Sequence, residues 1–510
     1  MAGSRFAASD VTAPPVAPSP ARAILKPRRL QVKHALAGPR MVSLLLPVLV
    51  ALHVAVFAYH SLGVLRFPFD LNYGEGYVLN DAVRLSRGEP LYVDLQQFPM
   101  VRSPYPPLFP LLWSAVLPLS GVGLWPGRLL ALLATVGLVV LVGWNAWRVR
   151  SGVLPVFASA GLVIASPFVY AWGAFARVDT LALLFAAGAV LSAHWLPARR
   201  GLTLAALLTL AAIWTKQTTL TAAIAIASAY LLRDIRAGVL FCLLVLIPSA
   251  MLLSALEYST NGEFARHVLV GNAANPVSVP RATIFVVTLL AVHLPAFAGG
   301  MWWLTRALRG VPSPVASYLA VSLLGALSAG NEGSSVNYLL EPVMAVALAV
   351  PFAWRALGMF GPLSNVVAGL LACLQLIVLL HWPNGFGITY LQEGSLGRTP
   401  TADDVAVGRR LDALVQAETG DLISEPAGFA VRNGRPVHVQ PIDLRAEQAL
   451  GRWDSRPLTE ALASGGFSLL ITAFDLFPAD VQRSIDAHFE VVETLRSPVG
   501  LTYRVWRFRG

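Results

Sequence analysis

Residues 41–77 read MVSLLLPVLVALHVAVFAYHSLGVLRFPFDLNYGEGY, and they set the class of the protein. The run from Met41 to Leu65 is about 25 apolar residues, enough to cross a hydrocarbon core of roughly 30 Å at about 1.5 Å per residue. It is too long for the core of a signal peptide and predicts an uncleaved anchor. The following segment places Asp70 and Glu75 beside glycines where the chain leaves the membrane. This arrangement indicates a membrane enzyme rather than a channel.

The rest of the chain has the composition of a polytopic membrane protein. Of its 510 residues, 56% are hydrophobic and 13% are charged, whereas soluble proteins carry about a quarter charged residues. The net charge of +10 does not indicate nucleic-acid binding, because the basic residues are mostly single arginines and pairs at the ends of apolar runs. Cys242 and Cys373 both lie in apolar segments, so no disulfide framework is implied.

Eleven apolar runs predict eleven spanning helices. A further run, 108–124, contains Pro110 and Pro118 and has almost no loop after it, so we expect a juxtamembrane helix at the outer surface. The expected spans are 41–65, 126–147, 153–173, 178–196, 202–215, 217–232, 238–256, 282–304, 314–329, 338–354 and 362–382.

The distribution of basic residues sets the expected orientation. With 108–124 at the surface, nine arginines fall in short loops on the side of the basic N-terminal tail, and five basic residues fall in the opposite short connections. The positive-inside rule then puts the N-terminus in the cytoplasm. The nine are Arg148, Arg150, Arg199, Arg200, Arg233, Arg236, Arg306, Arg309 and Arg355, and the five are Arg128, Arg177, Lys216, Arg266 and Arg281.

Three domains are expected. Residues 1–40 form a basic, proline-rich and disordered cytoplasmic tail. Residues 41–382 form the transmembrane domain, with its first outer loop at 66–125, and residues 383–510 form a small extracytoplasmic α/β domain of about 120 residues, large enough for its own core. In this last domain the pattern predicts helices at 403–417 and 479–489 and strands at 467–472 and 501–508.

Asp70 and Glu75 are the first candidates for chemistry. A general base for glycosyl or phosphoryl transfer must be a carboxylate held near the interface, and Gly74 and Gly76 allow close backbone approach around Glu75. The alternative is a solvated loop whose acids only cap the helix expected at 77–85.

Further candidates follow in the apolar region, each with a structural alternative. Arg102 precedes the stiff segment Tyr105-Pro106-Pro107-Leu108 and could contact a lipid phosphate, or the segment is a simple rigid turn. Arg177 and Asp179 stand at the outer end of a span, where charges are costly and often functional, or they anchor the span at the interface.

Lys216, with Gln217 and Thr218, interrupts two apolar runs that are each short for a span. Its ammonium suits a phosphate, or it belongs to an interfacial Trp/Lys belt. Glu341, four residues after Asn337, is about one turn into an apolar helix and must face a polar cavity or a partner, which the sequence does not identify.

These motifs, in this order, resemble the GT-C superfamily of membrane glycosyltransferases, which includes protein O-mannosyltransferases and the lipid A aminoarabinose transferase. The resemblance covers most of residues 41–382. It is carried by Asp70 to Glu75, Gly88-Glu89-Pro90-Leu91-Tyr92, Tyr105-Pro106-Pro107-Leu108, Arg128-Leu129, Arg177-Val178-Asp179, Lys216-Gln217-Thr218 and Asn337-Tyr338-Leu339-Leu340-Glu341.

The resemblance implies transfer of a hexosyl or pentosyl group from a polyprenyl-phosphate donor to a glycan, lipid or protein acceptor, with inversion at the sugar carbon. Glu75 or Asp70 would be the base. Which of the two acts is open, because many relatives carry adjacent acids whereas these two are five residues apart. Arg102, Arg177 and Lys216 would neutralise the departing phosphate. The expected substrate-binding residues are Tyr105, Asp179, Gln217, Asn337 and Glu341. A divalent metal is compatible with the family, but no ligand cluster beyond the two acids argues for one.

The expected location is a bacterial inner membrane, with no nucleic-acid partner. A transporter or flippase of a lipid-linked or anionic substrate would share the spans and the intramembrane charges, but it would more often show internal repeats, and none is evident. A sensor or assembly protein is a third alternative, for which eleven spans are excessive. The sequence does not name the sugar, the polyprenol or the acceptor.

Overall fold

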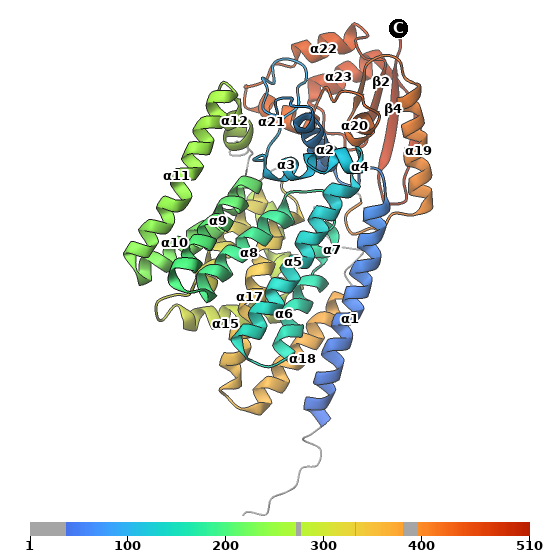
Figure 1. Ribbon diagram of the computed structural model, residues 1–510. Helices are drawn as coiled ribbons and strands as arrows, with labels where there is room; N and C mark the ends of the chain where they lie inside the picture. Colours follow the sequence, from blue (N-terminus) through green and yellow to red (C-terminus); the bar gives the residue numbers. More distant parts are fainter. Residues whose placement is uncertain (1–36, 272–276, 332, 381–394) are drawn as a thin grey trace, which may run out of the picture.

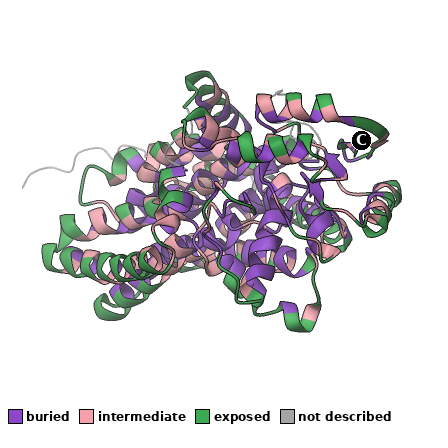
Figure 2. Ribbon diagram, turned by 90° about the horizontal axis from the view of Figure 1, so that it is seen from above, coloured by how far each residue is buried: buried purple, intermediate pink, exposed green. Residues whose placement is uncertain are grey.

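The computed structural model describes residues 37–271, 277–331, 333–380 and 395–510. The expected disordered tail lies almost wholly outside these residues, as do residues 383–394 of the expected outer domain. A helical bundle forms one part of the molecule, and the first loop together with residues 395–510 covers one end of it (Figure 1). These two covering parts are called the cap below. Seen from above, buried residues gather in the middle of the molecule, and the outer faces of the peripheral helices are exposed (Figure 2).

The bundle follows the order of the expected spans. Its elements are α1 (Ala37–Arg66), α5 (Trp125–Val149), α6 (Leu154–Ala165), α7 (Pro167–Trp172), α8 (Asp179–Trp195), α9 (Ala198–Thr215), η2 (Gln217–Thr219), α10 (Leu220–Arg233), α11 (Ile235–Ser259), α12 (Glu263–Ala265), η3 (Arg266–Val270), α14 (Val279–Val292), α15 (Leu294–Ala307), α16 (Pro314–Gly325), η4 (Ala326–Gly330), η5 (Val336–Leu339), α17 (Leu340–Gly358) and α18 (Pro362–Leu379).

Each expected span coincides with helix, but several are broken or short. Within the described residues, five helices are long and apolar enough to cross a membrane: α1, α5, α11, α17 with its η5 turn, and α18. A sixth span results if α14 and α15 count as one, although they meet at 95°, where Pro295 of α15 cannot continue the hydrogen-bond ladder. The chain is therefore a multi-helix membrane protein, and the number eleven stays a prediction.

The doubtful run 108–124 does not form a straight span. It forms two short helices, α3 (Leu108–Ser114) and α4 (Leu117–Ser120), which lie across the end of the bundle (Figure 1). The buried ring of Trp113 in α3 packs directly on Gly127 of α5. A Cβ added at Gly127 would lie only 2.5 Å from this ring, so a larger residue would not fit there. The run belongs to the first loop, as its prolines indicated.

The two sets of basic residues lie at opposite ends of the bundle. At the end away from the cap, Arg148 stacks over Trp195 at 5.1 Å, and Arg355 donates a hydrogen bond to the carbonyl of Val149. Arg128 and Arg177 instead meet residues of the first loop. This alternation agrees with the charge pattern, and which end faces the cytoplasm stays a prediction.

Residues 395–510 form a four-stranded sheet with helices around it. The strand order is β1-β2-β4-β3, in which β1 and β2 are parallel and the other pairs antiparallel. The four elements expected from the pattern are present, and β1, β3 and three helices were not foreseen. The elements are α19 (Ala402–Ala417), β1 (Leu422–Ser424), α20 (Gly428–Arg432), α21 (Pro441–Ala449), α22 (Arg456–Ala463), β2 (Leu469–Thr472), α23 (Ala479–His488), β3 (Phe489–Arg496) and β4 (Thr502–Phe508).

The sheet region shares its core with the first loop. Phe69 stacks on Phe429 of α20, with ring centroids 5.2 Å apart. Met100 pairs with Val439 in an isolated bridge, and both side chains are buried in one cluster with Ile423 of β1 and Leu470 of β2. The two parts of the cap are therefore built around common apolar contacts, and the three-domain division stays a prediction.

Replacing Phe429 by Ala should lower the thermal unfolding midpoint of the detergent-solubilised chain. The buried ring contacts Phe69 and Tyr503, and its loss should cost about 3–5 kcal/mol. Phe360→Ala, at a ring that is 67% exposed, is the matched control and should change little. Equal midpoints for the two variants would contradict a shared core.

Candidate functional site

Glu75 holds the start of α2 (Tyr73–Ser86), the helix of the first loop. It is the third residue of a capping box, in which Asn72 accepts a hydrogen bond from Gly74 and Glu75 accepts one from the Asn72 amide at 3.4 Å. The side chain is fully buried and accepts two bonds from Arg128 of α5, at 2.8 and 2.7 Å. The expected helix-capping role of this acid is therefore present in the structure.

Arg128 completes this arrangement from the bundle side. Beyond the ion pair, its guanidinium donates to the carbonyls of Val64, Phe67 and Phe69, so every part of the buried cation is used. Burial alone would raise the pKa of Glu75, but the positive charge of Arg128 and the hydrogen bonds hold that pKa below its ordinary value. The pair ties the end of α1 to the start of α2.

Asp70 is also buried, but its carboxylate has different neighbours from that of Glu75. Its carboxylate lies against two glycines: an added Cβ on Gly76 would stand 2.5 Å from one oxygen, and one on Gly428 of α20 would stand 2.1 Å from the other. Neither oxygen has a hydrogen-bond partner among the described residues. Burial first, and then the negative charge of Glu75, raise the pKa of Asp70 to about 7. Only glycine at these two positions leaves room for the acid.

Arg102 links the first loop to two other segments. Its guanidinium donates twice to the carbonyl of His267, at 2.8 and 2.7 Å, and once to Asp443 of α21 at 2.9 Å. The side chain is 2% exposed. In this geometry the buried guanidinium of Arg102 joins the first loop to the segments that contain His267 and Asp443. Its hydrogen bonds in the structure go to these two protein acceptors.

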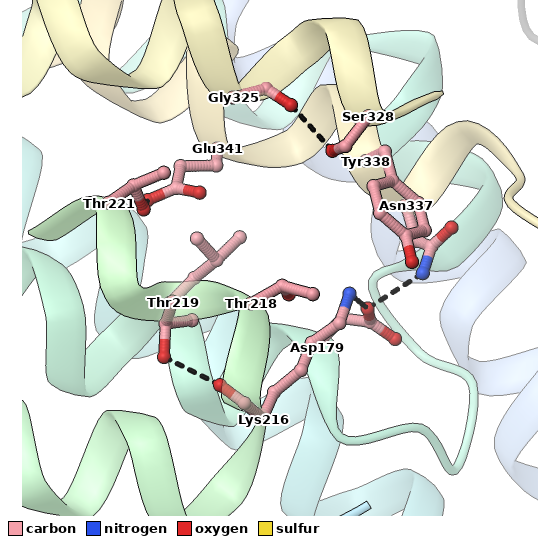
Figure 3. A pocket seen from close by; sticks show the side chains of 11 residues that line it. Asp179, Lys216, Thr218, Thr219, Thr221, Gly325, Ser328, Asn337, Tyr338 and Glu341 are labelled. Carbon is pink, nitrogen blue, oxygen red and sulfur yellow. Dashed lines mark hydrogen bonds and ion pairs between the residues drawn. The ribbon is translucent and has the colours of Figure 1, made fainter. Parts of the chain in front are cut away.

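A polar cavity of about 50 Å³ lies between the bundle helices near the cap (Figure 3). At its wall the ammonium of Lys216 donates to Asp179 at 2.5 Å, and Asn337 donates to the same carboxylate oxygen at 2.8 Å. The other oxygen of Asp179 accepts from the indole of Trp172 at 2.8 Å. The lining residues are Asp179, Leu183, Lys216, Thr218, Thr219, Thr221, Gly325, Ser328, Asn337, Tyr338 and Glu341.

Three helices begin at this cavity. Asp179 is the first residue of α8, Thr221 lies in the first turn of α10, and Glu341 lies in the first turn of α17. A helix start carries unpaired backbone N–H groups and a positive partial charge. Asp179 and Glu341 already place carboxylates at two of these starts, so the ammonium of Lys216 is the group that suits an added anion beside the cavity.

The first loop meets this region through Arg177 and Gln217. Arg177 donates to the hydroxyl of Tyr105 at 2.7 Å and packs so closely on Gly74 that a Cβ there would overlap its guanidinium. Gln217 donates to the carbonyl of Pro104 at 2.9 Å. Next to Arg177, the amide of Ala176 donates to Glu75 at 2.9 Å. The ion pair of the first loop thus touches the segment that leads into the cavity wall.

The structure divides the residues singled out in the sequence into two groups. Seven lie in or beside the cavity, whereas Asp70, Glu75 and Arg102 are buried within the cap and do not line it. Sequence reasoning missed Trp172 and Thr221, which had no signal beyond their type in an apolar run. It used Arg128 as a topology determinant and as part of a motif of the resemblance, but did not name it as a site residue. The seven are Tyr105, Arg177, Asp179, Lys216, Gln217, Asn337 and Glu341.

No side-chain cluster suited to a metal is evident here: the described residues contain no group of three or more His, Cys, Asp or Glu that could hold an ion. The histidines near the span ends that fall in the described ranges make ordinary hydrogen bonds. His53 contacts the carbonyl of Leu376 at 2.9 Å, and His293 contacts the hydroxyl of Ser166 at 3.1 Å. His381 lies outside the described residues.

Changing Glu75 to Gln should destabilise the protein by about 3–5 kcal/mol, because it leaves the buried cation of Arg128 without its anion. Thermal unfolding in detergent measures this loss. Asp475→Asn, which breaks the exposed ion pair with Arg504, is the control and should have no comparable effect. A Glu75→Gln variant as stable as the control would show that the pair does not hold the loop.

Comparison with known proteins identifies the fold. No family model and no curated protein sequence matches the chain. The crystal structure of ArnT from Cupriavidus metallidurans bound to undecaprenyl phosphate matches with a TM-score of 0.58 at 15% identity, over 90% of this chain and 97% of that chain. Its apo state gives 0.57 at 14% identity, with the same coverage. A cryo-electron microscopy structure of the arabinofuranosyltransferase AftD from Mycobacteria overlaps less well, with 0.42 at 16% identity over 90% of this chain and 41% of that one. The chain therefore has the fold of ArnT.

Proposed function

We propose that this chain is a membrane glycosyltransferase that moves a sugar from a polyprenyl-phosphate donor to an acceptor outside the cytoplasm. The observation that carries the proposal is the cavity at which three helices begin and which Lys216 and Asn337 line. Such a site favours a phosphate at the end of a bundle whose apolar surface suits a prenyl chain. The fold supports the same ligand class, because ArnT has been solved with undecaprenyl phosphate.

Lys216 is the first candidate for contact with the donor phosphate. An ammonium has three N–H donors, and the described contact with Asp179 uses one of them. Arg177 stands beside the cavity at the junction with the first loop and is the second candidate. Arg102 is a weaker candidate than the sequence suggested, because His267 and Asp443 already accept its hydrogen bonds.

The cavity must widen to admit a donor. Its volume of about 50 Å³ has room for a few water molecules, whereas sites for small molecules measure roughly 300–1,000 Å³. The walls that would move are short or interrupted elements, η2 and η5. Such turns change conformation more readily than the long helices beside them.

The proposed reaction is a single displacement. A carboxylate takes the proton of the acceptor hydroxyl, the acceptor oxygen bonds to the anomeric carbon, and the bond from that carbon to the phosphate oxygen breaks. The electron pair leaves with the prenyl phosphate, whose charge Lys216 stabilises. Attack from the face opposite the phosphate inverts the sugar carbon.

Asp70 is the better candidate for the base. Both oxygens of Glu75 are occupied by Arg128 and backbone amides, whereas the oxygens of Asp70 have no partner among the described residues. Its pKa of about 7 also suits proton transfer near neutral pH. Since Gly428 covers this carboxylate, an acceptor reaches it only when the segment of the cap at α20 moves aside.

Asp70→Asn should abolish sugar transfer while leaving the unfolding midpoint close to that of the wild type. For the wild type, only the ionised carboxylate accepts a proton, so kcat should rise with pH through a midpoint near 7, the raised pKa of Asp70. Transfer of labelled sugar from purified prenyl-phosphate sugars measures both effects.

The matched control is Asp94→Asn, at an exposed acid of the same loop, which should keep full activity and the same pH profile. Activity retained by Asp70→Asn would remove this residue as the base. A wild-type protein that consumes no donor from a broad panel of prenyl-phosphate sugars would remove the transferase proposal itself.

Lys216 can be tested without leaving an unpaired buried charge. Lys216→Met alone leaves the buried carboxylate of Asp179 without its cation. The double variant Asp179→Asn with Lys216→Met removes both charges of the pair. The double variant should fold, and its KM for the donor should rise by about tenfold or more, because a charge-assisted contact is lost. An unchanged KM in a folded double variant would exclude the proposed phosphate contact.

A further inference from the structure

The cavity has two chemically different ends (Figure 3). At one end Lys216 and Asn337 surround the carboxylate of Asp179. At the other end Glu341 accepts a hydrogen bond from the hydroxyl of Thr221, and the hydroxyl of Ser328 completes the lining. The first end presents a cation and an amide, and the second presents a carboxylate among hydroxyl groups.

The two ends are held by the same two walls of the cavity. Asn337 and Glu341 are four residues apart across η5 and α17, and Lys216 and Thr221 are five apart across η2 and α10. All four residues line the same cavity of about 50 Å³. A group bound at the Lys216 end and a group bound at the Glu341 end are therefore close neighbours.

The carboxylate at the second end is not neutralised by an ion pair. Lys216 is paired with Asp179, and among the residues that the structure describes no cation forms an ion pair with Glu341. A carboxylate offers about four lone-pair positions, two of which face the hydroxyl groups of Thr221 and Tyr318. Because the residue is only half-buried and faces the cavity, the remaining positions are available to hydrogen-bond donors on a ligand.

We propose that Glu341 determines which sugar the donor carries. This inference rests on the proposed transfer function and extends it. With the phosphate at the Lys216 end, one sugar ring reaches Glu341, which accepts hydrogen bonds from hydroxyl groups of that ring. A uronic acid would place a second carboxylate against Glu341 in a poorly hydrated site, where like charges repel strongly. The donor class is therefore a single sugar without a carboxylate, and acidic sugars are excluded.

The test compares donors that differ only in this group. Polyprenyl-phosphate hexoses and the matching uronic acids are offered to the wild type and to Glu341→Gln, and kcat/KM is measured for each. The wild type should use the neutral donor only. Glu341→Gln should lose about ten- to a hundredfold in kcat/KM with the neutral donor and should discriminate less against the uronic acid, because the repelling charge is gone.

The outcomes separate this inference from the transfer proposal. Glu493→Gln, the same change on β3 away from the cavity, should keep the wild-type ratio of the two donors. If the wild type transfers a neutral sugar and Glu341→Gln keeps both its rate and its preference, the inference is wrong while the transferase proposal stands. If the wild type transfers uronic acids as well as neutral sugars, the proposed exclusion is wrong. A wild type inactive with every donor removes the transfer function on which both depend.

Discussion

The buried ion pair between Arg128 and Glu75 is the contact on which the cap depends. It lies where the first spanning helix ends and the first loop begins, and it has no exposed side. Two charges removed from water are costly unless nearly all their hydrogen bonds are satisfied. Here the guanidinium uses three backbone carbonyls and the carboxylate uses backbone amides. One of those carbonyls belongs to Phe69, so the pair fixes the backbone directly before Asp70.

This pair explains why two acids five residues apart have different environments. Glu75 lies opposite a cation and stays ionised, whereas Asp70 lies against the glycine backbone at Gly76 and Gly428, and neither of its oxygens has a hydrogen-bond partner in the part of the chain that the structure describes. The same burial acts on both acids, and the neighbouring charge decides the direction of each pKa shift. Of these two acids, Glu75 thus holds the structure and Asp70 is able to accept a proton.

Much of the architecture could be predicted from the sequence, because apolar length and charge placement are local properties. The spans, the break at 108–124 and the helix beginning near residue 402 all follow from residues within a few positions of one another. Lys216 was expected as a phosphate contact, and Asp179 and Asn337 were expected as substrate-binding residues. Their pairing could not be predicted, because it joins residues 37 and 158 positions apart.

The remaining differences also come from long-range packing. Arg102 has the sequence context of a phosphate ligand, but its acceptors come from residues 267 and 443, which no local pattern connects to it. Strand β3 was not foreseen, because its burial pattern is mostly exposed and carries little apolar alternation. The covering of Asp70 by Gly428 joins positions 358 apart in the sequence, so only the folded chain reveals it.

The convergence of helix starts at the cavity has a consequence for how such a chain changes over evolutionary time. Backbone amides have the same chemistry whatever side chains surround them, so the electropositive character of this end of the bundle follows from where α8, α10 and α17 begin. Side chains around it are then free to diverge as long as the helices keep their first turns in place. Two chains with only 15% identity can therefore keep one fold while the side chains around its cavities diverge.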